Sequence, residues 1–283
     1  MQSFREEFQI GLQKYGNLKG IMKKSGVKAI IDSAISQFLN LMSKRLYKSN
    51  SPKFGLSEIF FRSRDIDRWS RYTRVTNEIS KIKEGKLSVL DVGSGGREIP
   101  GFASTWNYSL VDIQKDALKN LKRGHKVVGD ACKLPFRDKA FDVVISIDTA
   151  EHIPRSIRHN YFEELKRVHK RQIIITCPIQ SNDDLFKGKT YDLIFQHFYE
   201  KEKGLKEQNT AQHIASGHPT IDEIQKELPN SAIHGYKNCD VWLRYMLFSL
   251  KPFIGLFTGA LYYLFWKRKD DKPPYWGAII VSS

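Results

Sequence analysis

A glycine-rich turn that directly follows an apolar segment is the first feature of this sequence suited to binding a ligand. In the run VLDVGSGGREIPGF, at residues 89–102, Asp91 lies within the apolar segment, which is followed by the turn residues Gly93, Ser94 and Gly95. Glycine has no Cβ, so the backbone can turn sharply at these positions and a ligand can approach it closely. We therefore expect Asp91 and the turn residues to form part of a cofactor site.

Acidic residues follow the next three apolar segments. Asp112 lies in YSLVDI, seventeen positions after Gly95, Asp130 ends HKVVGD, and Asp148 ends FDVVISID. Asp112 can accept hydrogen bonds from a ribose diol. Asp130 is followed by the small residue Ala131 and can accept a hydrogen bond from the amine of a purine. A dinucleotide is not expected, because its Gly-x-Gly-x-x-Gly fingerprint needs glycine where Glu98 stands.

Short β-branched runs separated by helix-length stretches are expected to position these residues. The runs are LSVLDVG, YSLVDI, HKVVGD, FDVVISID and RQIIITC, and SAIHGYKN and YWGAIIVSS follow near the end. Continuous apolar runs of this kind predict a mostly parallel sheet that is buried on both faces, and residues 156–170 predict a crossover helix. Ligands of such doubly wound α/β sheets bind beyond the carboxyl ends of the strands, where the acidic residues lie.

Residues 87–180 resemble the class I S-adenosylmethionine-dependent methyltransferases. The similarity is greatest to the small-molecule type 11 kind, in which a loop such as LDVLEHVP corresponds to IDTAEHIP here. The resemblance implies a seven-stranded Rossmann-like sheet with an antiparallel last strand, and S-adenosyl-L-methionine as cofactor. It further implies that Asp91, Gly93, Ser94 and Gly95 bind the methionine part of the cofactor, that Asp112 binds the ribose, and that Asp130 and Ala131 bind the adenine. Asp148 would lie next to the sulfonium, and Ile113 is a further residue expected to bind the cofactor. Arg97 departs from the family pattern, which often has a small residue there.

Three histidines are candidates for a catalytic base. Methyl transfer from a sulfonium requires an aligned nucleophile, and a hydroxyl or amine acceptor also requires loss of a proton. His152 follows the fourth predicted strand, and His213 and His218 lie in QHIASGHPT. Each has an alternative as an ordinary loop histidine, and His218 also precedes a helix that Thr220 can cap. We expect a small or lipid-linked methyl acceptor; a nucleic-acid acceptor, or a protein that binds the cofactor without catalysis, are the alternatives.

Residues 1–86 are helical in pattern and strongly basic. They carry 18 Lys and Arg against 8 Asp and Glu, two thirds of the net charge of +15. Such an excess predicts an anionic partner, either a membrane surface or nucleic acid. An apolar helical face that packs on the next domain is predicted by Ile66, Trp69, Tyr72, Val75, Ile79 and Ile82. We therefore expect an N-terminal extension over residues 1–86 and a methyltransferase domain over residues 87–283.

An apolar stretch, residues 241–266, lies between the last two predicted strands. Arg244 and Lys251 interrupt it, and its charge-free part is shorter than the roughly 20 residues of a single membrane crossing. If the flanking strands are neighbours in one sheet, both ends of the stretch return to the same side. The stretch is thus predicted to be a helical hairpin, either packed in the core or inserted at the interface of an anionic membrane, where the aromatic residues and Lys267, Arg268 and Lys269 would suit the headgroups.

Other sequence features favour the cytoplasm. The N-terminal run has no signal-peptide pattern, and Cys132, Cys177 and Cys239 are too widely spaced to suggest a disulfide framework or a zinc site. We therefore expect a cytoplasmic protein, peripherally associated with membranes, and no bound metal.

Overall fold

The computed structural model of the chain describes residues 66–83, 85–95, 106–119, 121, 124–250, 259 and 262–283. Its elements in chain order are α5 (Ile66–Ser80), β1 (Ser88–Val92), β2 (Asn107–Asp112), α6 (Lys115–Lys119), β3 (His125–Val128), β4 (Phe141–Ile147), the 3-10 turn η1 (Ala150–His152), α7 (Arg158–Val168), β5 (His169–Pro178), α8 (Gly188–Lys203), α9 (Gln208–Ser216), α10 (Ile221–Glu227), β6 (Ala232–Asn238), α11 (Cys239–Ser249), the π-helical turn η2 (Tyr262–Trp266), α14 (Lys267–Asp270) and β7 (Tyr275–Ser282). The predictions for residues 1–65 and for Arg97 lie outside the described residues.

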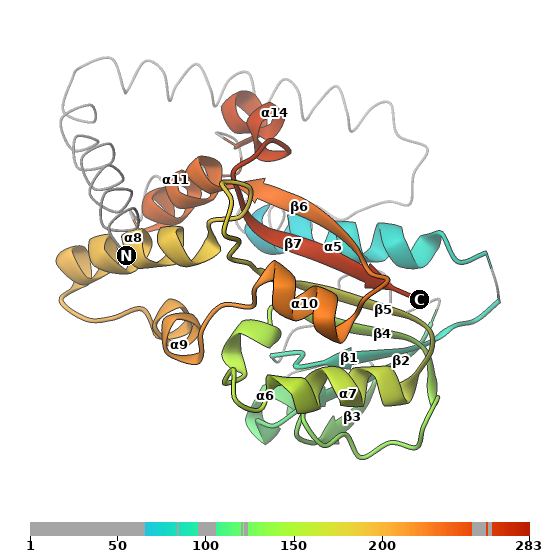
Figure 1. Ribbon diagram of the computed structural model, residues 1–283. Coiled ribbons are helices and arrows are strands. Elements are labelled where there is room, and N and C mark those ends of the chain that lie inside the picture. The colour runs from blue at the N-terminus through green and yellow to red at the C-terminus, as the bar shows by residue number, and fades with distance from the viewer. Residues whose placement is uncertain are drawn as a thin grey trace. The chain divides into compact units, whose positions relative to one another are not determined.

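Seven strands form one sheet in the order β3-β2-β1-β4-β5-β7-β6 (Figure 1). β1 is parallel to β2 and β4, β2 is parallel to β3, and β4 is parallel to β5. β7 is antiparallel to β5. The predicted doubly wound sheet with an antiparallel last strand is therefore confirmed. Its strand order reverses between β1 and β4, which is where ligands of this class of sheet bind.

Helices cover both faces of the sheet. Neighbouring residues of a strand point to opposite faces, so one strand contributes to the core on each side. On β1, Leu90 lies in one core cluster with residues of α7 and α10, and Val89 lies in a second with residues of α5 and α6. Tyr72, Val75 and Ile79 of α5 are in the second cluster and confirm the predicted apolar face of this helix. Complete burial of a side chain such as Val75 contributes about 1.5–3 kcal/mol, so α5 is an integral part of this core.

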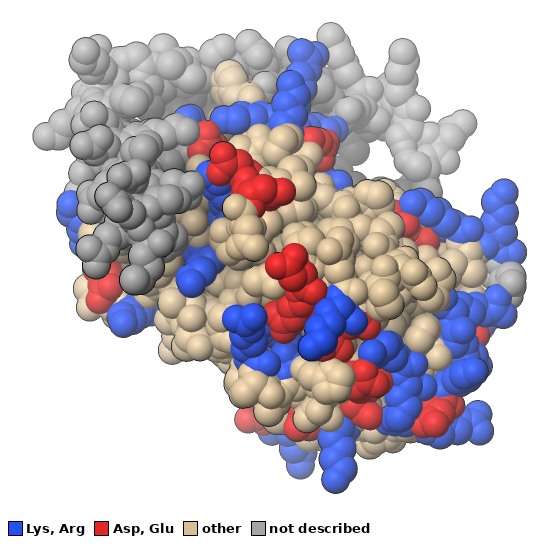
Figure 2. Space-filling view, in the orientation of Figure 1, with Lys and Arg blue, Asp and Glu red and all other residues tan. Residues whose placement is uncertain are grey.

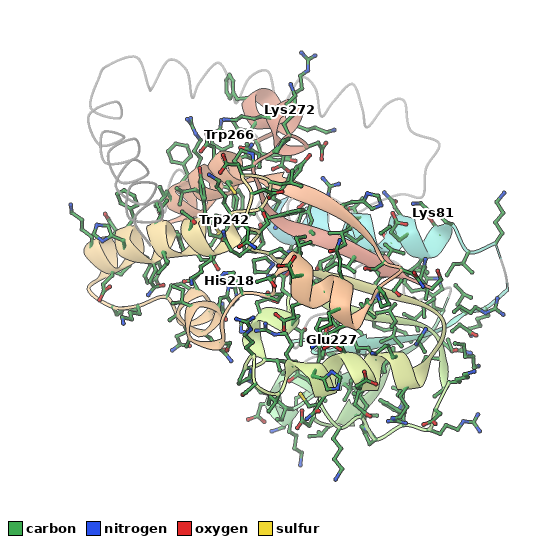
Figure 3. The ribbon with its side chains drawn as sticks, viewed as in Figure 1. Lys81, His218, Glu227, Trp242, Trp266 and Lys272 are labelled. Carbon is green, nitrogen blue, oxygen red and sulfur yellow. The ribbon has the colours of Figure 1, made fainter. Side chains whose placement is uncertain are left out.

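The described chain divides into two compact units. The sheet unit contains residues 70–189, 208–236 and 273–283. The second unit contains, among other residues, 190–207 and the described part of 237–272. Inside this second unit, the ring of Trp242 (labelled in Figure 3) packs edge to face with that of Phe195, with centroids 5.8 Å apart. Lys269 donates to Asp240 at 2.9 Å. The predicted domain boundary at residue 86 stays a prediction.

The apolar stretch that follows β6 begins as helix α11. The Asn238 side chain caps this helix by accepting hydrogen bonds from the backbone N–H groups of Asp240 and Val241. Trp242 and Leu243 are buried. Residues 251–258, 260 and 261 lie outside the described residues, so the hairpin stays a prediction. Among the helices that the structure describes, none is long and apolar enough to cross a membrane.

Candidate functional site

The glycine turn after β1 brings the backbone close to two neighbouring strands. Gly93 has φ +76° and Gly95 has φ +58°, in the left-handed region that glycine adopts without steric cost. The N–H of Gly93 donates to the Val111 carbonyl oxygen at 2.9 Å. A Cβ on Gly93 would lie only 2.4 Å from Oγ1 of Thr149, in the segment after β4. Glycine is therefore required at position 93 by both the backbone angle and the space available.

Asp112 fixes this turn from the end of β2. Its Oδ2 accepts from the N–H of Gly95 at 2.8 Å, and its Oδ1 accepts from the N–H of Gln114 at 2.8 Å. A carboxylate oxygen has more than one acceptor site, so Asp112 can still receive ligand hydroxyl groups. The next residue, Ile113, is 69% exposed and offers apolar surface beside the carboxylate. This arrangement is suited to a sugar with an attached flat ring.

Asp91 is a buried carboxyl group with one oxygen left open. Its Oδ2 accepts a hydrogen bond from the Tyr108 hydroxyl at 2.5 Å. Its Oδ1 accepts none from the residues that the structure describes. Burial raises the pKa of Asp91 to about 7, against the lowering effect of the Tyr108 hydrogen bond, and the charge of Asp112 raises it further. An open, buried carboxyl oxygen of this kind fits a ligand ammonium group, which would favour the ionised form.

The other two strand-end acids lie in different environments. Asp130, after β3, is exposed, and its Oδ1 accepts from the N–H of Cys132 at 2.8 Å. The adjacent Ala131 packs against the first core cluster. Asp148, after β4, has φ +50° and forms an ion pair with Arg71 of α5. No sequence pattern pointed to Arg71, which adds a positive charge to this edge of the sheet.

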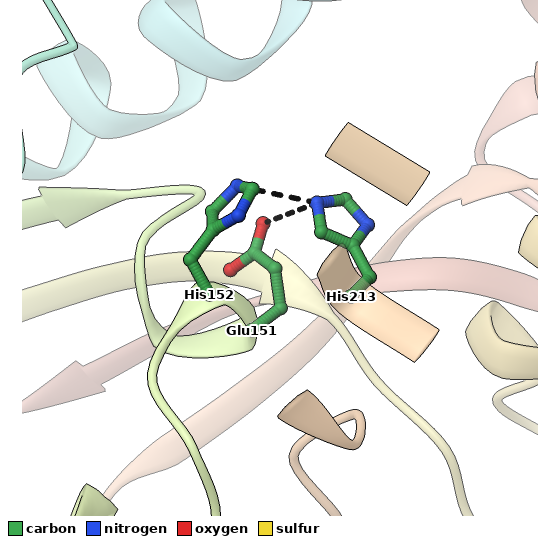
Figure 4. A group of neighbouring side chains, drawn as sticks. All are labelled: Glu151, His152 and His213. Atoms are coloured by element: carbon green, nitrogen blue, oxygen red, sulfur yellow. Dashed lines mark hydrogen bonds and ion pairs between the residues drawn. The ribbon is translucent and has the colours of Figure 1, made fainter. Parts of the chain in front are cut away.

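The three candidate histidines converge from two segments of the chain. His152 ends η1 and His213 lies on α9, and their Nε2 atoms are 3.2 Å apart (Figure 4). The ring centroids of His213 and His218 are 5.9 Å apart. Glu151, which sequence reasoning missed, is fully buried, and its Oε1 lies 3.8 Å from His213 Nε2. Thr220 accepts from the N–H of Glu223 and caps α10, as predicted from the sequence.

Arg158 fastens together the two segments that carry these histidines. This side chain is fully buried, and its Nη2 donates to the carbonyl oxygen of Ile153 at 2.8 Å and also to that of Gly217. Its Nη1 lies 3.1 Å from Oε2 of Glu223. The Ser216 hydroxyl adds a hydrogen bond of 3.1 Å to the carbonyl oxygen of His152. The loop after β4 and the end of α9 are thus held as one structure.

A separate pocket of about 990 Å³ lies beside α10. It is lined by residues 180–183, 185 and 186, by residues of α10 and by the nearby Arg155 and His159. None of the candidate cofactor residues lines it. This pocket is therefore distinct from the candidate cofactor residues at the carboxyl edge of β1 to β4.

The face of the sheet unit that carries α7 has mixed charge. Figure 2 shows Lys and Arg side chains interspersed with Asp and Glu on the visible face. On α7, Lys166 pairs with Glu163, and Arg167 pairs with Glu164 and Asp138. The basic side chains at this end of α7 are therefore paired with neighbouring acids. The attraction to an anionic partner that was predicted from residues 1–86 stays a prediction.

Comparison with known proteins finds similarity to one protein family over the segment that forms this edge of the sheet. Residues 90–176 match the model of the type 11 methyltransferase domain. An uncharacterized protein of Methanocaldococcus jannaschii is 28% identical over 108 residues, which are 37% of this chain and 45% of that protein. The demethylmenaquinone methyltransferase of Thermotoga maritima is 28% identical over 155 residues, 52% of this chain and 66% of that enzyme. A solved structure from Pyrococcus horikoshii is 28% identical, with a TM-score of 0.35, over 39% of this chain and 58% of that one. The matched regions span less than two thirds of each of these three proteins.

Proposed function

We propose that this chain, whose residues 90–176 are a class I S-adenosylmethionine-dependent methyltransferase domain, transfers the cofactor's methyl group to a small or lipid-linked acceptor. The observation that carries the proposal is the meeting of the glycine turn with Asp91, Asp112, Asp130 and Asp148 at one edge of the sheet. All of these residues belong to the matched segment.

The residues at this edge have separate roles in the proposed complex. Asp91 and the turn, Gly93, Ser94 and Gly95, bind the methionine part. Asp112 binds the ribose hydroxyls beside Ile113, Asp130 and Ala131 hold the adenine, and Asp148 lies next to the sulfonium. The open Oδ1 of Asp91 supports the first assignment, because it can accept a hydrogen bond from the methionine ammonium.

The chemistry that the protein must supply is alignment. S-adenosylmethionine carries a methyl group already activated by its sulfonium, so the chain's contribution is to position the acceptor and to exclude water. A hydroxyl acceptor must also lose a proton, for which His152, His213 and His218 are the nearest candidates to test. Their mutual proximity supports a shared role in this step.

Cofactor binding is tested by calorimetry on purified variants. Asp112→Ala removes the acceptor that also fixes Gly95, and a lost hydrogen bond to a charged group is worth about 1.5–3 kcal/mol, or roughly 10- to 100-fold in affinity. Asp116→Ala is the matched control, because Asp116 lies on α6 with 86% of its side chain exposed. Gly93→Arg fills the narrow space beside Thr149 and is expected to abolish binding. Unchanged affinity in both site variants would remove the assignment.

Methyl transfer is tested with labelled cofactor against separated lipid, glycan, small-molecule and RNA fractions. Quinones are included, because the relative from Thermotoga maritima is named for demethylmenaquinone. Label in a lipid or small-molecule fraction supports the proposal. Label in RNA alone would replace it with a nucleic-acid methyltransferase, and cofactor binding without transfer to any fraction would favour a non-catalytic protein.

The proposal includes reversible association with anionic membranes. Its support is the apolar stretch 241–266, the exposed Lys267, Arg268 and Lys269 that follow it, and the basic residues 1–86. Each basic residue near an anionic surface contributes about 1 kcal/mol. The association would bring the active site to a lipid-linked acceptor.

Vesicle flotation tests this part. The intact chain is expected to float with phosphatidylserine-containing vesicles at low salt, and a Leu256→Glu/Leu264→Glu variant is expected to remain at the bottom of the gradient. A Leu205→Glu variant, changed at a leucine that is 57% exposed, is the control and should float. A folded wild-type chain that fails to float would contradict the membrane association and leave the methyl-transfer proposal intact.

A further inference from the structure

We propose that Glu151, His152 and His213 bind a divalent transition-metal ion, and that this ion receives the oxygen of a hydroxyl acceptor. The second half rests on the proposed function, whereas metal binding stands without it. The expectation of no bound metal rested on the wide spacing of the three cysteines, none of which belongs to this cluster. Folding brings one carboxylate and two imidazoles together from η1 and α9.

The distances are close to those of ligands that share one ion. One ligand atom from each of the three residues lies within 4.8 Å of the other two. Imidazole nitrogens bound to a common ion at about 2.0–2.1 Å, with an angle between about 90° and 110°, lie roughly 2.8–3.4 Å apart. The Nε2 atoms of His152 and His213 are 3.2 Å apart, and Oε1 of Glu151 is 3.8 Å from His213 Nε2 (Figure 4). One ion can therefore contact all three with small side-chain adjustments.

The burial of the Glu151 carboxylate provides the second, independent observation. Its side chain is completely buried, and neither carboxylate oxygen accepts a hydrogen bond from any residue that the structure describes. Burying an ionised carboxylate is costly unless a cation or hydrogen-bond donors compensate it. His213 at 3.8 Å compensates only when it is protonated. A divalent ion would neutralise this carboxylate and use neutral imidazoles as ligands.

The chemistry of the ligands selects the class of metal. Imidazole nitrogens favour zinc, iron, copper and nickel, whereas magnesium and calcium favour sites made of oxygen atoms. Two imidazoles and one carboxylate thus fit Zn²⁺ better than Mg²⁺, and the carboxylate also makes Mn²⁺ a usable paramagnetic probe. Three protein ligands leave a coordination position open for water or substrate. His152 is only partly buried, which leaves this cluster a route to solvent.

The cluster lies next to the segment that touches the glycine turn. The Thr149 hydroxyl lies 3.2 Å from the carbonyl oxygen of Val92 and 3.3 Å from that of Gly93. Thr149 directly precedes η1, which ends in Glu151 and His152. A metal ion held by the cluster would therefore lie near the proposed methionine end of the cofactor.

The ion would activate the acceptor directly. A metal ion lowers the pKa of a bound hydroxyl group, so the acceptor loses its proton to solvent water. The oxygen lone pair then forms a bond to the methyl carbon, and the electrons of the breaking carbon–sulfur bond move to sulfur, which leaves as a neutral thioether. In this scheme His152 and His213 act as ligands, and no histidine is required as the base.

The test is a titration of the chelator-treated full chain with Mn²⁺, followed by electron paramagnetic resonance, with Zn²⁺ as competitor and Mg²⁺ as the hard-ion comparison. We expect one Mn²⁺ ion to bind per chain. Zn²⁺ should displace it, and the same concentration of Mg²⁺ should not. Loss of an outer-shell partner of a metal site costs 10- to 100-fold in affinity, so loss of a ligand in Glu151→Gln or His213→Ala should cost more than about 100-fold. His234→Gln, at an exposed histidine on β6, should bind as the wild type does.

Cofactor calorimetry on the same samples separates the two proposals. Variants that keep cofactor affinity and lose Mn²⁺ are folded, and they assign the metal to this cluster. A chain that binds Mn²⁺ and not the cofactor would refute the proposed function and retain the metal site. A wild-type chain without stoichiometric Mn²⁺ or Zn²⁺ binding, or unchanged affinity in both ligand variants, would overturn the inference and leave a hydrogen-bonded histidine pair.

Discussion

Asp91→Asn should change how the stability of this protein depends on pH. Burial raises the pKa of Asp91 from 3.8 to about 7. Between these values the folded chain holds a proton that the unfolded chain has released, so the wild-type free energy of unfolding falls as pH rises from about 4 to about 7 and is level above that range. One pKa unit corresponds to about 1.4 kcal/mol, so the full effect is at most about 4 kcal/mol. Asn cannot ionise, so the free energy of unfolding of the variant does not fall over this pH range for this reason.

Urea unfolding of both proteins between about pH 5 and pH 8 measures the effect. The free energy of unfolding of Asp91→Asn minus that of the wild type should rise by about 1–3 kcal/mol from pH 5 to pH 7 and then level off. The constant cost of placing an amide beside Tyr108 shifts this difference equally at every pH. Asp116→Asn, at an exposed acid, should show no such rise. A difference for Asp91→Asn that does not vary with pH would mean that the buried carboxyl ionises at an ordinary pKa, which would refute the reasoning.

Three further predictions use the same assays. Gly93→Ala should lose cofactor binding and destabilise the fold by more than Gly204→Ala does. Gly204 has a similar φ of +73° but open space around it, so Gly204→Ala should lower the free energy of unfolding by only about 1–2 kcal/mol. Equal losses of the two variants in urea would show that the contact with Thr149 relaxes. Arg158→Met should lower the free energy of unfolding by about 3–5 kcal/mol because it leaves buried partners unpaired, whereas Arg155→Met, at an exposed site, should change it little. If Asp91 binds the methionine ammonium, calorimetric cofactor affinity should rise with pH up to about 7 in the wild type and not in Asp91→Asn; parallel profiles would place the ammonium elsewhere.

The sheet and the glycine turn could be predicted because their signals are local. The central strands contain short β-branched runs, such as VVISI in β4 and IIIT in β5, and a glycine follows β1 at the position where the structure has a positive φ. Strand-end positions of Asp112, Asp130 and Asp148 follow from the same runs, since parallel strands end at a common edge. The helix over Ile66–Ser80 was predicted from the spacing of its apolar residues.

The contacts of the site could not be predicted, because they join residues that are far apart in the sequence. Arg71 reaches Asp148 only because α5 packs on the sheet, and His213 reaches His152 only because α9 returns to η1. Neither pair has a sequence pattern that identifies its partner. Glu151 follows the same logic, since its burial depends on the surrounding elements rather than on its neighbours in EHIP. The sequence identified these histidines one by one and could not show that they form a cluster.

The anchoring by Arg158 has a consequence for the protein's motions. The N–H of Arg155 donates to the carbonyl oxygen of Ser216 at 3.2 Å, and the N–H of Gly217 donates to that of His213 at 3.0 Å. Neither the loop after β4 nor the end of α9 can move outward without breaking hydrogen bonds from the Arg158 guanidinium. The two amides should therefore exchange with deuterium through one cooperative opening, with a common dependence on denaturant. An acceptor that enters past these loops would meet a single gate, whose opening rate sets an upper limit on its entry.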